Sequence, residues 1–181
     1  MEVIKNNFEG VLVITTKKYT DDRGVFYENF RDDIFNKAAN TKIKFLQENE
    51  SISKRNVIRG LHYQSPPYAQ GKLVRVIQGA VIDVIVDIRK NSITYGKTFK
   101  IELSSINGLQ LWIPEGFAHG FMSLEDNTVL NYKCTSYYNK ESENAILWND
   151  ETLKIEWNND SPILSEKDRI APSFNFLKSP F

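Results

Sequence analysis

The chain has 181 residues, 41% hydrophobic and 25% charged, which fits a globular protein with a sizeable core. Its 23 basic and 23 acidic side chains cancel, which argues against a global positive field that would hold nucleic acid or an anionic membrane. Cys134 is the one cysteine, which excludes an intramolecular disulfide and a multi-cysteine metal cage. The sequence shows neither a signal-like N-terminus nor a bilayer-length apolar run, so we expect a cytoplasmic protein with no membrane or nucleic-acid partner.

Short β-strands dominate the predicted elements. Helix is a minor component, expected over residues 32–39 and in a short helix capped by Ser165. No repeat, low-complexity tract or linker interrupts the pattern, so we expect one domain over residues 1–181. The spacing of the strand-like runs predicts an all-β sandwich or barrel. These runs cover residues 11–15, 25–30, 43–51 (residues 43–46 and 47–51 as one strand), 57–64, 72–78, 81–88, 98–103, 109–113, 120–124 and 129–135.

The stretch from residue 57 to residue 72 concentrates the candidate chemistry. It contains Arg59, His62 and Lys72 on two predicted strands joined by a proline-containing turn. On a regular pleat Arg59 and His62 point to opposite faces, but Gly60 lies between them and accommodates a bulge that brings both to one face. The plain alternative is a structural histidine on an ordinary strand.

A buried carboxylate is expected on the strand over residues 81–88. Val81, Asp83, Ile85 and Asp87 share one face of a strand that is apolar enough to be buried. Because an unpaired buried carboxylate is costly, we expect Asp83 to pair with a cation inside the barrel, and Lys72 is the candidate. Cys134 lies in another strand-like run, which favours a buried, inert thiol.

The second histidine, His119, ends a run from Gly108 in which Gly, Pro and Gly punctuate a strand and a tight turn. This run resembles the second motif of the cupin barrels, with Ser123 in place of the usual closing asparagine. Metal-binding cupins have two histidines one residue apart in their first motif, where this chain reads His62-Tyr63-Gln64. With two histidines and no cysteine cluster, we expect no metal, unless carboxylates bind a hard cation weakly.

A more specific resemblance covers nearly the whole chain. It is carried by Asp22-Arg-Gly-x-Phe-x-Glu28, Gln47-x-Asn49-x-Ser51-x-Ser53, Arg59-Gly-Leu-His62-Tyr-Gln, Lys72-Leu-Val-Arg-Val, Asp83-x-x-x-Asp87-x-Arg89, Pro114-x-Gly-Phe-Ala-His119-Gly-Phe, Tyr132-Lys and Ser165-Glu-Lys-Asp168. Together and in this order, these motifs resemble the dTDP-4-dehydrorhamnose 3,5-epimerase family of cupin-type nucleotide-sugar epimerases.

The resemblance implies a cupin jelly-roll barrel of antiparallel strands with a few short peripheral helices. It also implies a homodimer in which the first strands pair with the second subunit. The implied reaction needs no cofactor. It is the epimerisation at C3 and C5 of dTDP-4-dehydro-6-deoxy-D-glucose to dTDP-4-dehydro-L-rhamnose through enolate intermediates, with the nucleotide sugar as the small-molecule partner.

The resemblance also implies roles for individual residues. His62 is the base that removes the proton next to the C4 ketone, Asp168 holds its imidazole, Tyr132 is the proton donor, and Lys72 faces the developing enolate. The residues implied to surround the nucleotide, phosphates and sugar are Arg23, Phe26, Glu28, Gln47, Asn49, Arg59, His119, Tyr138, Glu143 and Lys167.

These roles agree with elementary chemistry, although each residue has a plain alternative. An enolate needs a cation at its oxygen, a histidine titrates near neutrality, and inversion needs a donor on the opposite face of the ring. By pattern alone, Tyr132 is a core aromatic, Asp168 a solvated helix-terminal charge and Arg23 a surface side chain. Two other functions stay open: a single-position epimerase or ketoisomerase acting on another nucleotide sugar, and a non-catalytic sugar-binding cupin.

Overall fold

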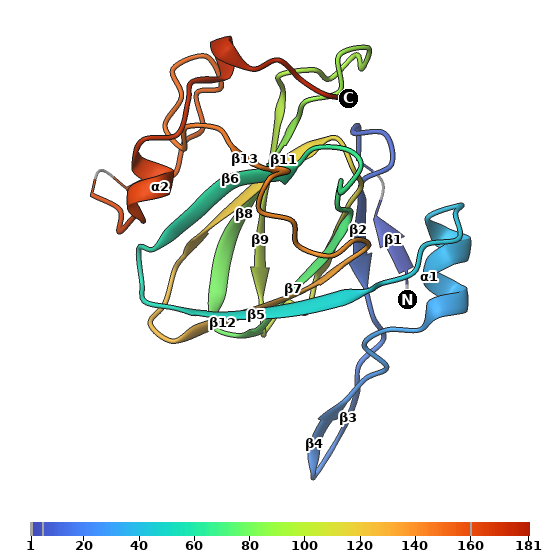
Figure 1. Ribbon diagram of the computed structural model, residues 1–181. Coiled ribbons are helices and arrows are strands. Elements are labelled where there is room, and N and C mark those ends of the chain that lie inside the picture. Colours follow the sequence, from blue (N-terminus) through green and yellow to red (C-terminus); the bar gives the residue numbers. More distant parts are fainter. Residues whose placement is uncertain (1, 5, 160) are drawn as a thin grey trace.

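The computed structural model describes residues 2–4, 6–159 and 161–181, and its main body is two antiparallel β-sheets that face each other (Figure 1). One sheet has the order β1-β2-β10-β7-β12-β5 and the other β13-β6-β11-β8-β9. The strands are β1 (Glu2–Ile4), β2 (Leu12–Thr15), β5 (Gln47–Ser53), β6 (Ile58–Gln64), β7 (Lys72–Gln78), β8 (Ala80–Asp87), β9 (Thr98–Ser104), β10 (Gln110–Ile113), β11 (Phe117–Ser123), β12 (Thr128–Cys134) and β13 (Glu143–Ala145).

Apolar side chains fill the space between the two sheets. Val74 and Leu111 come from the six-stranded sheet, and Ile85, Leu103 and Phe121 come from the five-stranded sheet; each is at most 4% exposed. They sit at alternate positions along their strands, because successive side chains of a strand point to opposite faces. The prediction of an all-β jelly-roll barrel of antiparallel strands is confirmed.

The outer face of each sheet is covered by a different part of the chain. Helix α1 (Asp32–Ala38) places Phe35 against Trp112 and Leu73 on the six-stranded sheet. The segment after β13 packs Trp157 and Phe174 onto the outer face of the five-stranded sheet. That segment also contains α2 (Glu166–Arg169) and a 3₁₀ turn, η1 (Phe174–Phe176). Helices are therefore short and peripheral, as expected, and in the described part of the chain no helix is long and apolar enough to cross a membrane.

A separate hairpin, β3 (Tyr19–Asp21) and β4 (Gly24–Phe26), projects from the barrel (Figure 1). Every residue of its two strands is exposed, and the side chains include the hydrophobic Tyr19, Val25 and Phe26. The predicted strand over residues 25–30 ends at Phe26, because the chain then turns back and packs Phe30 against Phe35.

Of the strand predicted over residues 43–51, the part from residue 47 is present in β5, but the part over residues 43–46 is wrong. The side-chain amide of Asn36 accepts a hydrogen bond from the backbone N–H of Ile43 at 2.6 Å and donates to the carbonyl of Ile43 at 3.2 Å. Since these backbone groups are satisfied by a side chain of α1, they do not join a strand ladder. The apolar Ile43 and Phe45, which suggested a strand, pack under α1.

The bulge expected at Gly60 is present. In the pairing of β6 with β11, Arg59 lies opposite Phe121 and His62 lies opposite His119. Between these two pairs β6 contains one residue more than β11, which defines a bulge. Gly60 has φ +130°, and a Cβ there would lie 2.5 Å from the Cα of Gly120. The two backbones therefore touch at the bulge, and only glycine fits.

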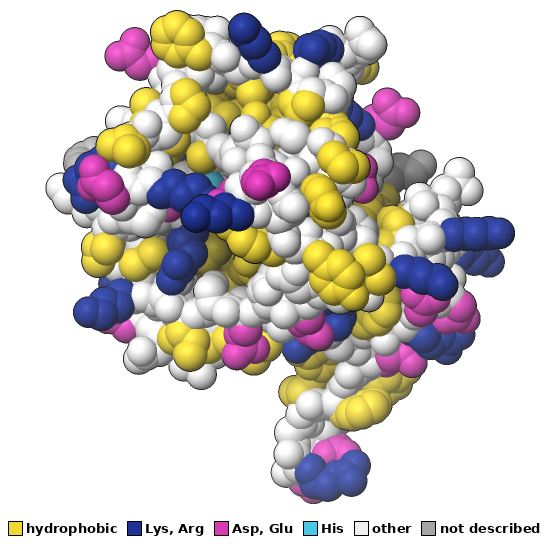
Figure 2. Space-filling view, viewed as in Figure 1, with side chains coloured by type: hydrophobic (Ala, Val, Ile, Leu, Met, Phe, Trp, Pro, Cys, Tyr) yellow, Lys and Arg dark blue, Asp and Glu magenta, His cyan; other side chains and the backbone are white. Residues whose placement is uncertain are grey.

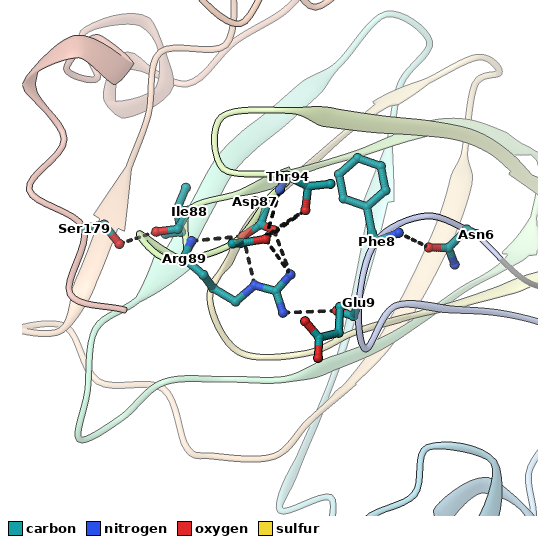
Figure 3. A network of polar contacts seen from close by, with 9 residues as sticks. Asn6, Phe8, Glu9, Asp87, Ile88, Arg89, Thr94 and Ser179 are labelled. Carbon is teal, nitrogen blue, oxygen red and sulfur yellow. Dashed lines mark hydrogen bonds and ion pairs between the residues drawn. The ribbon is translucent and has the colours of Figure 1, made fainter.

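A buried polar network ties the end of β8 to the N-terminal segment (Figure 3). The Asp87 carboxylate accepts hydrogen bonds from Arg89, Ser92 and Thr94 at 2.6 to 2.9 Å. Burial opposes ionisation of Asp87, yet these bonds lower its pKa to about 2. The Arg89 guanidinium also lies 4.5 Å from the ring centre of Phe117 and donates to the carbonyl of Glu9.

Candidate functional site

A cavity of about 800 Å³ opens at one end of the barrel, between the two sheets and beside α2. In the space-filling view, basic side chains gather around a hollow in which a histidine is visible (Figure 2). The walls come from β5, β6, β7, β11 and β12 and from the segment around α2. The predicted site residues that line this cavity are Gln47, Asn49, Arg59, His62, Lys72, His119, Tyr132, Tyr138, Lys167 and Asp168.

His62 and Asp168 form a close pair at the wall of the cavity. The Nε2 atom of His62 lies 2.5 Å from the Oδ1 atom of Asp168. Asp168 is held because Ser165 caps α2, as predicted, and its hydroxyl accepts the backbone N–H of Asp168 at 3.1 Å. Burial opposes ionisation of Asp168, but hydrogen bonds from His62 and Ser165 outweigh it and lower its pKa. The structure thus buries Asp168 beside an imidazole rather than in solvent.

Lys72 and Tyr132 lie on neighbouring strands, β7 and β12, and both line the cavity. Desolvation lowers the pKa of Lys72, while the charges of Cys134, Asp83 and Glu143 oppose that shift. Burial raises the pKa of the Tyr132 phenol, so this side chain keeps its proton and can donate it. Cys134 is fully buried, as expected, and burial raises the pKa of its thiol.

Three predicted residues form a chain of contacts at the rim. Lys167 makes an ion pair with Glu143, and the Tyr138 hydroxyl donates to Glu143 at 3.1 Å. Burial opposes ionisation of Glu143, but Lys167 and Tyr138 outweigh it and lower its pKa. Glu143 lines a smaller adjoining cavity of about 90 Å³, which His62, Lys72 and Tyr132 border too.

The partner expected for Asp83 was wrong. Asp83 is fully buried inside the barrel, as the strand pattern indicated, but its carboxylate lies 2.9 and 3.0 Å from Nε2 of His119. The charge of Asp83 acts on Lys72 only through space, where it opposes the lowering of the pKa of Lys72 by desolvation. This pairing could not be predicted from the sequence, because the two residues meet diagonally across β8 and β11.

Polar side chains of β5 line the opposite wall. Gln47 donates to Asn49 at 2.9 Å and accepts the backbone N–H of Tyr138 at 2.8 Å, which links the wall to the rim. Arg59 enters from β6 and donates to Ser53 at 3.3 Å. Arg59 and His62 both line the cavity, as the bulge at Gly60 predicted.

Three predicted substrate-binding residues lie away from this cavity. Arg23 and Phe26 belong to the projecting hairpin and border a separate hollow of about 360 Å³ there, and Glu28 is an exposed residue just beyond β4. The Arg23 side chain is 90% exposed and pairs with Asp21 at 2.5 Å. Within one chain, the structure therefore does not bring these three residues to the other eleven, ten of which line this cavity while Glu143 lines the adjoining one.

The cavity also contains residues that the sequence did not single out as site residues. Ser51 alternates with Gln47 and Asn49 on β5, so the period of two could have found it. Its hydroxyl is buried with no hydrogen-bond partner in the described part of the chain. Phe121 and Ile163 line the cavity as well, and Ile163 carries no sequence signal because an irregular segment brings it there.

Among residues 2–4, 6–159 and 161–181, no three His, Cys, Asp or Glu side chains gather as metal ligands do. Each histidine of the cavity instead has a carboxylate partner, His62 with Asp168 and His119 with Asp83. This donor set suits proton transfer next to a carbonyl and the binding of anionic groups.

The chain is similar to known proteins over almost its whole length. Residues 5–175 match the family model described as dTDP-4-dehydrorhamnose 3,5-epimerase. A protein of that name from Shigella flexneri is 50% identical over 174 residues, which are 96% of each chain. The crystal structure of a dTDP-6-deoxy-D-glucose-3,5-epimerase from Legionella pneumophila Philadelphia 1, in complex with dTDP-4-keto-L-rhamnose, superposes with a TM-score of 0.93 at 42% identity, covering 97% of this chain and 94% of that one.

A third similar structure has a different stated specificity. It is a 3'-monoepimerase from Streptomyces bikiniensis in complex with dTDP-quinovose, with a TM-score of 0.87 and 32% identity, covering 91% of this chain and 84% of that one. The match to the family model, over residues 5–175, includes every residue that lines the cavity, and the 50% identical relative covers 96% of the chain. The chain therefore belongs to the dTDP-4-dehydrorhamnose 3,5-epimerase family.

Proposed function

We propose that this chain epimerises C3 and C5 of dTDP-4-dehydro-6-deoxy-D-glucose, without a cofactor, to give dTDP-4-dehydro-L-rhamnose. The observation that carries the proposal is the convergence of the His62–Asp168 pair, Lys72 and Tyr132 on one cavity. Membership of the family supports the substrate and the isomerase chemistry. A relative crystallised with dTDP-4-keto-L-rhamnose supports the sugar.

In the proposed reaction His62 takes the proton from the carbon next to the C4 ketone. Asp168 selects the tautomer of His62 and stabilises the imidazolium that forms. The charge that moves onto the C4 oxygen meets the Lys72 ammonium, and Tyr132 returns a proton from the opposite face. The same sequence of steps inverts C3 and C5, because both carbons flank the ketone.

Arg59, Gln47 and Asn49 are proposed to bind the nucleotide and phosphates. An arginine offers paired N–H donors to phosphate oxygens, and the amides offer directed hydrogen bonds. His119, Tyr138, Glu143 and Lys167 are proposed to bind the rest of the substrate.

We also propose that the protein is a homodimer in which the projecting hairpin enters the cavity of the partner. Arg23, Phe26 and Glu28 match the family motifs, yet they lie away from the cavity of their own chain. An exposed hairpin carrying Tyr19, Val25 and Phe26 also needs an apolar surface to cover it. The dimer accounts for both observations. A cytoplasmic location is part of the proposal and fits the free thiol of Cys134.

One assay tests the reaction. Purified protein is incubated with dTDP-4-keto-6-deoxyglucose and an NADPH-dependent reductase that accepts only the 4-keto-L-rhamnose product, and NADPH oxidation is followed. We expect oxidation that depends on the protein and is abolished in His62→Ala. If wild-type protein supports no oxidation while a known epimerase does, the proposed function is wrong.

A single-position epimerase is the second candidate, favoured by the similarity to the 3'-monoepimerase. The two activities differ in the configuration at C5 of the product. Proton NMR of the product distinguishes them through the ring coupling constants. We expect inversion at both carbons, and a product inverted at C3 alone would assign this chain to the second candidate.

A further inference from the structure

A second histidine–carboxylate pair lies beneath the cavity. His119 is on β11 and Asp83 is on β8, where His119 pairs with Ile85 and Phe121 pairs with Asp83. His119 and Asp83 are therefore diagonal neighbours on the inner face of the sheet. The Nε2 atom of His119 lies 2.9 Å from one oxygen of Asp83 and 3.0 Å from the other.

The surroundings of this pair are apolar. Asp83 is 0% exposed and His119 is 7% exposed, among core residues that include Ile85 and Phe121. A buried carboxylate is costly unless it accepts hydrogen bonds, and in the described residues His119 is the side chain that bonds to it. An ionised carboxylate accepts only, so the proton of this contact belongs to Nε2 of His119.

The other ring nitrogen of His119, Nδ1, can form a hydrogen bond with a ligand in the cavity. His119 lines the cavity, and no hydrogen bond joins its Nδ1 atom to any described residue. In the register of β6 and β11, His119 lies directly opposite His62. His119 is therefore next to the proposed base, where the reacting sugar would bind. Because Nε2 is held by Asp83, Nδ1 is the ring nitrogen that can form a hydrogen bond with the bound sugar.

We propose that Asp83 is a positioning residue that acts through His119, holding its Nε2 atom so that its Nδ1 atom faces the bound sugar. The proposal deepens the proposed function and rests on it, because the sugar is that of the proposed substrate. It gives the cavity two histidines with opposite tasks: His62 removes a proton, and His119 keeps its own proton and binds.

Asp83 also affects Lys72, so the effect of an Asp83 substitution on activity through Lys72 must be separated from its effect through His119. The charge of Asp83 acts through space on Lys72, which Cys134, Glu143 and Lys167 face as well. Asp83→Asn would therefore alter Lys72 in addition to His119. A double-mutant cycle with His119 distinguishes the two routes, because only an effect that passes through His119 disappears when His119 is already replaced.

The first measurement is made on the wild type, with one variant used only to assign the resonances. The chain contains two histidines, so the imidazole ¹⁵N spectrum of labelled protein shows four ring nitrogens, and His119→Gln identifies those of residue 119. We expect Nε2 of His119 to be protonated in the wild type, and Nδ1 to shift when the equilibrium mixture of substrate and product is added. A wild-type spectrum in which Nε2 of His119 carries no proton overturns the proposal.

The second measurement is the cycle. We expect Asp83→Asn and His119→Gln each to lower kcat/KM at least tenfold, and the double variant to lie within threefold of the worse single variant. Asp87→Asn is the matched control: it removes another fully buried carboxylate from the same strand, but one bonded to Arg89, Ser92 and Thr94. This control should keep the ¹⁵N shifts and kcat/KM of the wild type.

Two results of the cycle overturn the proposal. One is a double variant whose loss is the product of the two single losses. The other is an Asp83→Asn variant that keeps the wild-type kcat/KM and His119 shifts. A wild type that does not epimerise the substrate is a separate result, since it rejects the proposed function while the protonation of Nε2 is still measured.

Discussion

The imidazole of His62 and the carboxylate of Asp168 are separated by 106 residues along the chain and by 2.5 Å in space. One comes from the barrel strand β6 and the other from α2, which packs against that strand. Because the carboxylate holds the ring in one orientation, the pair is equipped to accept a proton.

Removal and return of the proton should belong to different residues. In deuterated water, His62→Ala should neither epimerise the substrate nor incorporate deuterium at C3 or C5, because no other base takes its place. Tyr132→Phe keeps the ring and its packing, so His62 can still form the enolate and return a deuteron to the original face. Deuterium should then enter without inversion, as NMR of the recovered substrate will show. Loss of exchange in a folded Tyr132→Phe that still binds dTDP contradicts the two-residue assignment.

Lys72 should act on turnover rather than on nucleotide binding. Lys72→Met keeps most of the stem and removes the charge, and the loss of one such donor costs about 3 kcal/mol of transition-state stabilisation, roughly a hundredfold in kcat. Calorimetry should find dTDP binding close to that of the wild type. A variant with normal kcat and weakened dTDP binding would assign Lys72 to the phosphates instead.

The pH dependence of kcat should reflect the lowered pKa of Lys72. Desolvation lowers the pKa of Lys72, so its protonated form is lost at a lower pH than that of an exposed lysine. In the wild type, kcat should therefore fall on the alkaline side before an ordinary lysine titrates. The residual activity of Lys72→Met should lack this fall. An identical alkaline limb in both proteins would mean that another group is responsible.

Mixing two inactive variants should restore activity if the hairpin serves the partner. Arg23→Ala removes the hairpin arginine and leaves the cavity intact, whereas His62→Ala does the reverse. In a mixed dimer, the cavity with His62 receives the hairpin with Arg23, so one of the two sites is complete. Activity should rise after the subunits are exchanged by dilution and reassociation. Each variant exchanged with itself is the control, and no rise in the mixture would show that each hairpin serves its own chain or none.

Asp87 should stabilise the fold down to strongly acidic pH. Its pKa falls from 3.8 to about 2 on folding, so its contribution is complete above pH 4 and is lost as the pH drops towards 2. Asp87→Asn removes charged hydrogen bonds and should lower the free energy of unfolding at neutral pH by about 2 kcal/mol. Urea unfolding at several pH values measures this, and the stability of the variant should change less than that of the wild type between pH 4 and pH 2. If the free energy of unfolding changed equally with pH in the wild type and in Asp87→Asn, Asp87 would be excluded as the titrating group.

Activity should survive prolonged chelation. The cavity pairs its histidines with carboxylates, and its proposed chemistry uses the Lys72 ammonium as the positive charge. Protein dialysed against a strong chelator should keep its kcat, with elemental analysis of the same sample as the control. A stoichiometric transition metal whose removal abolishes turnover would contradict this mechanism.

The barrel and the bulge could be predicted because their causes are local. Alternating apolar residues mark most of the strands, and Gly60 between Arg59 and His62 marks the extra residue of β6. The first part of the strand predicted over residues 43–51 failed because the amide of Asn36 satisfies the backbone of Ile43. A pattern of apolar residues carries no information about such a side chain.

The residues of the candidate site could be predicted where they belong to sequence motifs of the family. His62, Lys72, Tyr132 and Asp168 come from four separate segments, and only the family resemblance joined them before the structure did. The partner of Asp83 could not be read from the sequence, because strand register selects His119 over Lys72. Local patterns identify the face on which a side chain lies, and tertiary packing decides which residue it meets.

The position of Asp168 on α2 separates the formation of the barrel from the completion of the site. The strands of both sheets lie between residues 2 and 145, whereas the carboxylate that orients His62 belongs to a four-residue helix near the other end of the chain. During refolding, the β-sheet signal and the burial of Trp112 can therefore recover before the pair of His62 and Asp168 is assembled. The regain of epimerase activity should be the last event.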